Sequence, residues 1–163
     1  MDNRLNLEEY LRSFKSDDEK RKVFFAISEE MHRYHNNGCY VGNLSFQTVS
    51  VCFTNSTDIK FLYYDKIGKL SLDDVLNHKK NNILNLAIIM LSALLYNSNH
   101  LVVLNVDVIK KDFDKFKSIL SEVDYKYFES VFIKDEYLYY DDYIRGITQT
   151  NPKPFVEKIY HCA

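Results

Sequence analysis

The sequence predicts a mainly α (α+β) protein: a set of helices with one small β-hairpin. Three observations carry this prediction. Apolar residues recur at three- and four-residue spacing up to Tyr34, which is the spacing of one helix face. Residues 81–96 are almost continuously apolar, as in a helix buried on most sides. Between these segments, two β-rich runs, 48–54 and 58–64, flank an Asn55-Ser56-Thr57 turn.

Size and composition set the domain organisation. At 163 residues, 46% of them hydrophobic, the chain is long enough for one well-buried core and short for two. We therefore expect a single domain over residues 1–163. The prolines at 152 and 154 end the last helix, so residues 149–163 are expected to form a loosely packed C-terminal tail.

Two capping patterns mark the first helices. Asn6 with Glu9 predicts the start of a short amphipathic helix, and Ser16 with Glu19 predicts the start of a long one. Gly38 stands where a left-handed residue would end the long helix. The core-facing side of this long helix is expected to carry Val23, Phe24, Ile27, Met31 and Tyr34.

The second half of the chain reads as further helices. Ser71 and Asp74 are candidate caps for a small helix within residues 66–80. Asp107 is expected to cap a helix that runs to about Val123, and residues 124–133 repeat its pattern. A last helix is predicted over 137–147.

Charge and cysteine usage exclude several classes of protein. A formal net charge of −2 gives no global field for nucleic acid, and the densest lysines alternate with Asp112 and Asp114, so no nucleic-acid binding is expected. No apolar run is long enough to span a bilayer, and the acidic N-terminus is no signal peptide. Three scattered cysteines favour a reducing setting, so we expect an intracellular, cytoplasmic protein without membrane insertion.

The helix, glycine, loop and hairpin between Met31 and Asp65 resemble the catalytic-loop region of a eukaryotic-type protein kinase C-lobe. On that pattern the H-R-D positions fall on Val41, Gly42 and Asn43. Thr48 stands at the metal-binding asparagine, and Tyr63 stands at the aspartate of D-F-G. Kinase chemistry requires a carboxylate for the hydroxyl proton and another for magnesium. The resemblance therefore implies a C-lobe without catalysis, because the degenerate positions Asn43, Thr48 and Tyr63 carry no negative charge.

The later helices continue this resemblance. Asn82 stands where the central C-lobe helix has the aspartate that tethers the catalytic loop, and the amide keeps the size without the charge. No Gly-rich loop or V-A-I-K strand precedes Leu5, so no ATP or other cofactor is expected. An isolated, inactive C-lobe is similar to the KIND (kinase non-catalytic C-lobe) family, whose modules bind partner peptides.

His32, His35 and Cys39 are candidate metal ligands, because two histidines three residues apart can share a helix face. A fourth ligand is not evident, although Cys52 lies across the hairpin, so no metal site is predicted. The competing interpretation places both histidines on the polar side of a helix end, where a cation favours the helix dipole.

The segment from Asp135 to Tyr143 interleaves carboxylates with tyrosines, which favours recognition of a basic peptide. Helical spacing directs Leu138, Tyr139, Ile144 and Ile147 to the core. The residues expected wholly or partly outside, and hence at a partner, are Asp135, Glu136, Tyr140, Asp141, Asp142 and Tyr143. The competing interpretation is an ordinary solvated helix. A second docking place is the groove between the hairpin and residues 66–80.

These patterns give one leading function and two alternatives. The chain is expected to be a non-catalytic interaction or scaffolding module for a protein or peptide partner, since no P-loop, G-x-S-x-G, H-E-x-x-H or dinucleotide motif occurs. The first alternative is an enzyme or regulator with an unrecognised, metal-dependent site. The second is a structural subunit that self-assembles.

Overall fold

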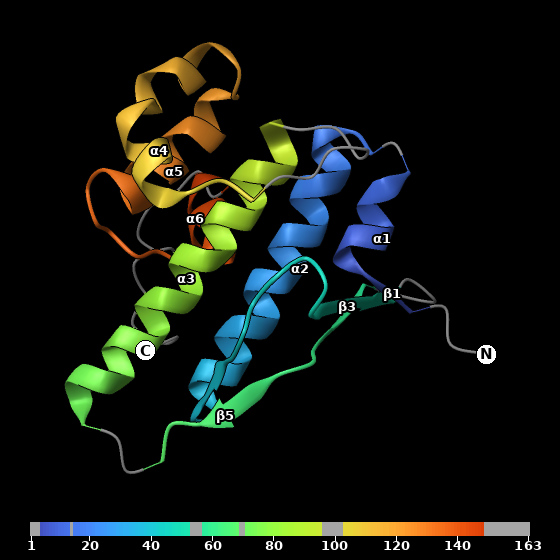
Figure 1. The fold of residues 1–163 in the computed structure, drawn as a ribbon, viewed down its shortest axis with the longest axis vertical. Helices are drawn as coiled ribbons and strands as arrows, with labels where there is room; N and C mark the ends of the chain where they lie inside the picture. The colour runs from blue at the N-terminus through green and yellow to red at the C-terminus, as the bar shows by residue number, and fades with distance from the viewer. Residues whose placement is uncertain (1–3, 14, 53–56, 69–70, 96–102, 149–163) are drawn as a thin grey trace.

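Two long helices, α2 (Asp17–Asn36) and α3 (Leu72–Leu95), lie side by side through the centre of the protein (Figure 1). The structure is a computed structural model that describes residues 4–13, 15–52, 57–68, 71–95 and 103–148. Shorter helices and small antiparallel strands surround the central pair. The predicted mainly α (α+β) fold is therefore confirmed.

Both predicted capping boxes are present. Asn6 accepts a hydrogen bond from the backbone N–H of Glu9 at the start of α1 (Leu7–Arg12), and the Glu9 carboxylate accepts one from the N–H of Asn6. Ser16 and Glu19 make the same pair of bonds at the start of α2. Gly38 has the predicted left-handed backbone, with φ of +76°.

The predicted hairpin pairs β3 (Val49–Cys52) with β4 (Asp58–Phe61), and Asn55 and Ser56 of its turn lie outside the described residues. The prediction of a single hairpin was incomplete. A third strand, β1 (Leu5–Asn6), joins β3, and a second sheet pairs β2 (Cys39–Val41) with β5 (Tyr64–Lys66). These extra strands are two or three residues long, too short for a period-two pattern to mark them.

The helices of the second half differ from their predicted bounds. Residues 72–80 are the first turns of α3 and form no separate helix, because no glycine or proline interrupts the run. The helix expected from Asp107 to Val123 is capped by Asn105 and breaks at Asp112. In its place stand α4 (Val106–Lys111), the 3-10 helix η1 (Phe113–Ser118) and α5 (Glu122–Phe132). The last helix, α6, spans Tyr140–Thr148.

One apolar core joins the central helices to the sheet and to α5. Its largest fully buried side chains include Phe24 and Met31 of α2, Met90 of α3 and Phe128 of α5. Each such side chain contributes about 1.5–3 kcal/mol by leaving water. Among the described residues, no helix combines the length and the apolarity that crossing a membrane requires. The predicted C-terminal tail, 149–163, lies outside the described residues.

Candidate functional site

The structure divides the acidic, tyrosine-rich segment into a buried and an exposed part. Asp135 and Glu136 are exposed, and Asp142 and Tyr143 are half-buried. The exposure predicted for Tyr140 and Asp141 was wrong, since they are 2% and 1% exposed. Helix α6 begins at Tyr140, whereas the predicted last helix began at residue 137. The face of α6 that packs on the protein therefore differs from the face predicted from helical spacing.

Leu138 and Ile147, which helical spacing directed to the core, are instead exposed. Tyr139 and Ile144 are half-buried. Asp135 has a left-handed backbone, with φ of +53°, and the chain from 135 to 139 is not helical. The segment is therefore an irregular approach to α6 and not a continuous helix face.

Asp141 attaches α6 to α2. Its Oδ1 accepts a hydrogen bond from the Ser28 hydroxyl at 2.7 Å, and its Oδ2 accepts one from Arg145 Nη1 at 2.6 Å. Nδ1 of His32 lies 3.6 Å from the same Oδ2. Burial raises the pKa of Asp141, but the interactions with His32, Ser28 and Arg145 outweigh burial and hold the pKa below its usual range. The carboxylate is therefore ionised at neutral pH.

Arg145 is a site residue that the sequence reasoning missed. Besides Asp141, its guanidinium pairs with Glu29 of α2 and lies 3.6 Å from Asp142 Oδ1. It also stands over the Phe25 ring at 5.1 Å. The signal that could have found it is its position four residues after Asp141 on a helix, the spacing of an ion pair.

The predicted set of His32, His35 and Cys39 does not form one cluster. Among the described residues, the group that could hold a metal joins His32 to Asp141 and Asp142, and it leaves out His35 and Cys39. His32 and His35 are 6% and 3% exposed, so their predicted place on a polar helix face was also wrong. Helix α6 and the residues before it cover this side of α2, which brings Tyr139 into stacking contact with His32.

His35 is bound into a buried network. Its Nε2 lies 2.8 Å from Asn82 Oδ1 and its Nδ1 lies 2.5 Å from the Tyr139 hydroxyl. Asn82 Oδ1 also accepts from the N–H of Val41 at 2.8 Å, and Asn82 Nδ2 donates to the Val41 carbonyl at 2.7 Å. Because an amide oxygen only accepts, Nε2 of His35 must carry the proton and Nδ1 accepts from Tyr139.

Burial lowers the pKa of His35 to about 4, although the hydrogen bond to Asn82 opposes the shift. An unfolded histidine titrates near pH 6.5. Below pH 6.5 His35 binds a proton in the unfolded state but not in the folded state. The free energy of unfolding is therefore highest above pH 6.5 and declines as the pH falls to about 4. We expect a loss of about 3 kcal/mol over this window, measured by urea unfolding.

The control for this prediction is a pair of glutamine variants. His35→Gln should flatten the acid slope of the unfolding free energy. His78→Gln should keep it, because His78 is half-buried beside Tyr40 and outside the network. Equal slopes in the wild type and in His35→Gln would assign the acid sensitivity to other groups.

The three degenerate kinase positions gather at the end of β2. The Thr48 hydroxyl donates to the Asn43 carbonyl at 2.8 Å, and the N–H of Gly42 donates to the Tyr63 carbonyl at 3.0 Å. Asn43 has a left-handed backbone, with φ of +47°. Tyr63 is 54% exposed. The side chains at these three positions are an amide, a hydroxyl and a phenol.

The first turns of α3, residues 72–81, extend past the rest of the protein (Figure 1) and are called the α3 overhang below. Helical spacing places Leu72 and Leu76 on the same face as Ile83 and Met90, which are buried. Leu72 is nevertheless 74% exposed and Leu76 is 44% exposed. The core-facing stripe of α3 therefore continues beyond the side chains that cover it.

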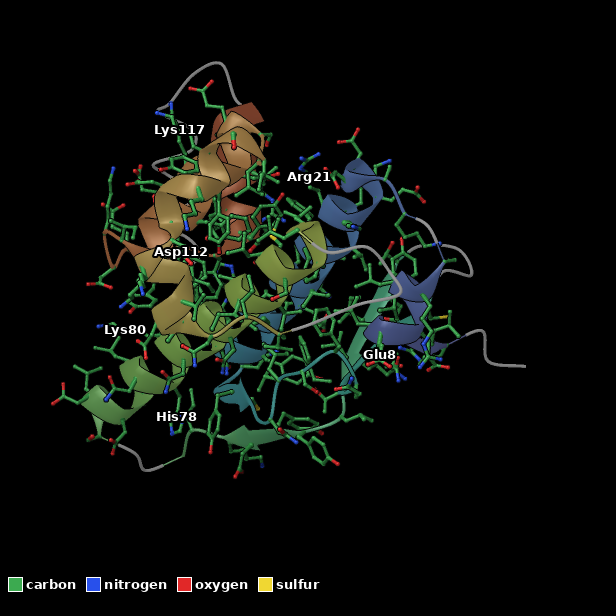
Figure 2. All side chains as sticks on the ribbon, turned by 45° about the horizontal axis from the view of Figure 1, so that its top comes forward. Glu8, Arg21, His78, Lys80, Asp112 and Lys117 are labelled. Carbon is green, nitrogen blue, oxygen red and sulfur yellow. The ribbon has the colours of Figure 1, made fainter. Side chains whose placement is uncertain are left out.

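Acidic groups flank this apolar end. Asp73 and Asp74 are exposed in the first turn, and no cation of the described residues pairs with them. Lys80 of the overhang is labelled in Figure 2. Its Nζ lies 5.6 Å from the centre of the Tyr137 ring. Tyr137, which follows Asp135 and Glu136 in the chain, therefore contacts the α3 overhang.

No protein-family model, curated protein or solved structure matches the chain.

Proposed function

We propose that the protein is a non-catalytic binding module, built on a scaffold like a kinase C-lobe, that holds a protein or peptide segment against the α3 overhang. The observation that carries this proposal is the exposure of Leu72 and Leu76 on the core-facing stripe of α3. Large apolar side chains on a shared helix face, with a polar rim, are typical of an interaction surface.

The charges at this surface indicate what kind of segment binds. Asp73 and Asp74 stand beside the exposed leucines in the first turn of α3. Asp135 and Glu136 are exposed and precede Tyr137, whose ring contacts Lys80 of the overhang. Carboxylates around an apolar centre complement a segment that carries apolar anchors between basic residues.

Two contacts support the kinase-like part of the proposal. Asn82 binds both backbone groups of Val41, and the resemblance gives Asn82 the place of the residue that tethers the catalytic loop. The hydrogen bond from Gly42 to Tyr63 brings the H-R-D and D-F-G positions together. The absence of carboxylates at Asn43, Thr48 and Tyr63 supports a module without phosphoryl transfer.

The test uses peptides selected from a random display library on the wild-type protein. We expect binders that combine apolar anchors with Lys or Arg. The double variant Leu72→Asp/Leu76→Asp should weaken them about ten- to hundredfold, because two apolar side chains no longer leave water in the complex. Fluorescence anisotropy of the labelled peptides measures the affinity.

The matched control is Ile119→Asp. Ile119 is 63% exposed and follows η1 directly. This variant tests whether replacing any exposed apolar residue with aspartate weakens peptide binding. Peptides that bind the leucine variant as tightly as the wild type would remove the α3 overhang from consideration. Transfer of phosphate from ATP by the purified wild-type protein would contradict the non-catalytic part of the proposal.

A further inference from the structure

His32, Asp141 and Asp142 bring three metal-ligating atoms together from two helices. Nδ1 of His32 on α2 lies 3.6 Å from Asp141 Oδ2 and 3.7 Å from Asp142 Oδ2, both in the first turn of α6. One ligand atom of each residue lies within 4.8 Å of those of the other two. His32 and Asp141 are buried and Asp142 is half-buried.

These separations suit a shared cation. Two ligands held by one tetrahedral ion at about 2.0–2.1 Å lie roughly 3.4 Å apart. The separations of 3.6 and 3.7 Å are longer than a hydrogen bond between nitrogen and oxygen and close to this value. His32 can therefore share an ion with either carboxylate after shifts of a few tenths of an ångström.

Two of the three ligand residues, His32 and Asp141, are already held in place. The imidazole of His32 stacks on the Tyr139 ring at 3.9 Å with 5° between the planes. The other oxygen of Asp141 is fixed by the hydroxyl of Ser28. In metalloproteins, neighbouring groups commonly orient the metal ligands in this way.

A way in from solvent exists. A cleft of 170 Å³ opens beside the cluster and is lined by Glu29, His32, Arg33, Asn36, Asp141 and Arg145. It is large enough for an ion with bound water. Three protein ligands leave the fourth tetrahedral position open, and a water molecule from this cleft can fill it.

Arg145 is the cation that an entering metal ion must compete with. It binds the same Oδ2 of Asp141, but that oxygen has a second lone pair. Arg145 also pairs with Glu29 and stands over Phe25, so it keeps partners if it moves. Arg33, the other guanidinium at the cleft, pairs with Glu30. The cluster carries a net negative charge, because the single positive charge of Arg145 faces the three carboxylates of Asp141, Asp142 and Glu29.

We propose that His32, Asp141 and Asp142 bind one divalent transition-metal ion, with Zn²⁺ as the best match. One imidazole with two carboxylates suits a borderline ion, whereas Mg²⁺ and Ca²⁺ prefer oxygen ligands alone. The bound ion would join α2 to α6 through side chains of both helices. This site differs from the surface at the α3 overhang, and neither proposal depends on the other.

The experiment is a titration of the chelator-treated full-length protein with Zn²⁺ by calorimetry, and with Co²⁺ by visible absorption. It is done in a Cys39→Ser/Cys52→Ala/Cys162→Ser background, so that no thiolate can supply a ligand. We expect one equivalent of Zn²⁺ and a tetrahedral Co²⁺ spectrum. Asp142→Asn should lower the affinity by more than about tenfold.

Two more variants complete the test. Arg145→Gln should raise the affinity, because the competing guanidinium is gone. His78→Gln changes a histidine outside the cluster and should bind Zn²⁺ as the background protein does. Asp142 is partly exposed, so circular dichroism should show a folded Asp142→Asn variant. No uptake of Zn²⁺, or equal uptake by the background protein and Asp142→Asn, overturns the proposal.

Discussion

Replacing Asn82 with leucine should lower the free energy of unfolding by about 4 kcal/mol. The change keeps the volume but leaves the N–H and the carbonyl of Val41 without partners, as well as Nε2 of His35. Each buried polar group left unpaired costs about 1–3 kcal/mol. Asn82 is 4% exposed, so water cannot replace the amide. In a chain of this size the melting midpoint should fall by roughly 10 °C.

Asn85→Leu is the matched control, because it makes the same chemical change at an exposed position of α3. It should alter the stability by less than about 0.5 kcal/mol. Asn82→Asp adds a second measurement. The carboxylate beside the imidazole should raise the pKa of His35, so the acid-dependent loss of stability between pH 6.5 and 4 should shrink. Equal free energies of unfolding for Asn82→Leu and Asn85→Leu would mean that the hydrogen bonds of Asn82 do not stabilise the fold.

The parts of this fold that the sequence predicts are those that depend on neighbours in the chain. The capping boxes of Asn6 and Ser16 each join residues three apart, and both are present. The left-handed Gly38 ends its helix for a local steric reason. The pairing of β3 with β4 joins two strands that are close in sequence and clearly patterned. No long-range information is needed for any of these features.

The errors concern contacts between distant segments. Asp141 appeared to be a surface residue because its charge suggests exposure, yet Ser28 and His32 on α2 give it partners more than 100 positions away. Tyr140, which packs against the Tyr127 ring of α5, is buried as well. His35 was predicted to lie on a polar face because the local sequence does not reveal its buried partner. That partner, Asn82, lies 47 positions further along the chain. Burial of polar residues is thus the least predictable property of this chain.

The second large effect should come from Arg21→Met, which removes the partner of a buried carboxylate. Nε and Nη2 of Arg21 bind Oδ2 of Asp124 at 2.9 and 2.7 Å and join α2 to α5. Asp124 is 1% exposed, and its Oδ1 accepts no hydrogen bond from the described residues. Leaving this charge buried and uncompensated should cost about 3–5 kcal/mol in urea unfolding at neutral pH.

The expected size of the effect depends on burial and not on the presence of an ion pair. Arg12→Met breaks the exposed pair with Glu8 and should cost less than about 1 kcal/mol. The double variant Arg21→Met/Asp124→Leu should recover most of the stability that Arg21→Met loses, because two apolar side chains replace the buried pair. A deficit in Arg21→Met that the second substitution does not reduce would mean that the arginine acts through its aliphatic packing alone.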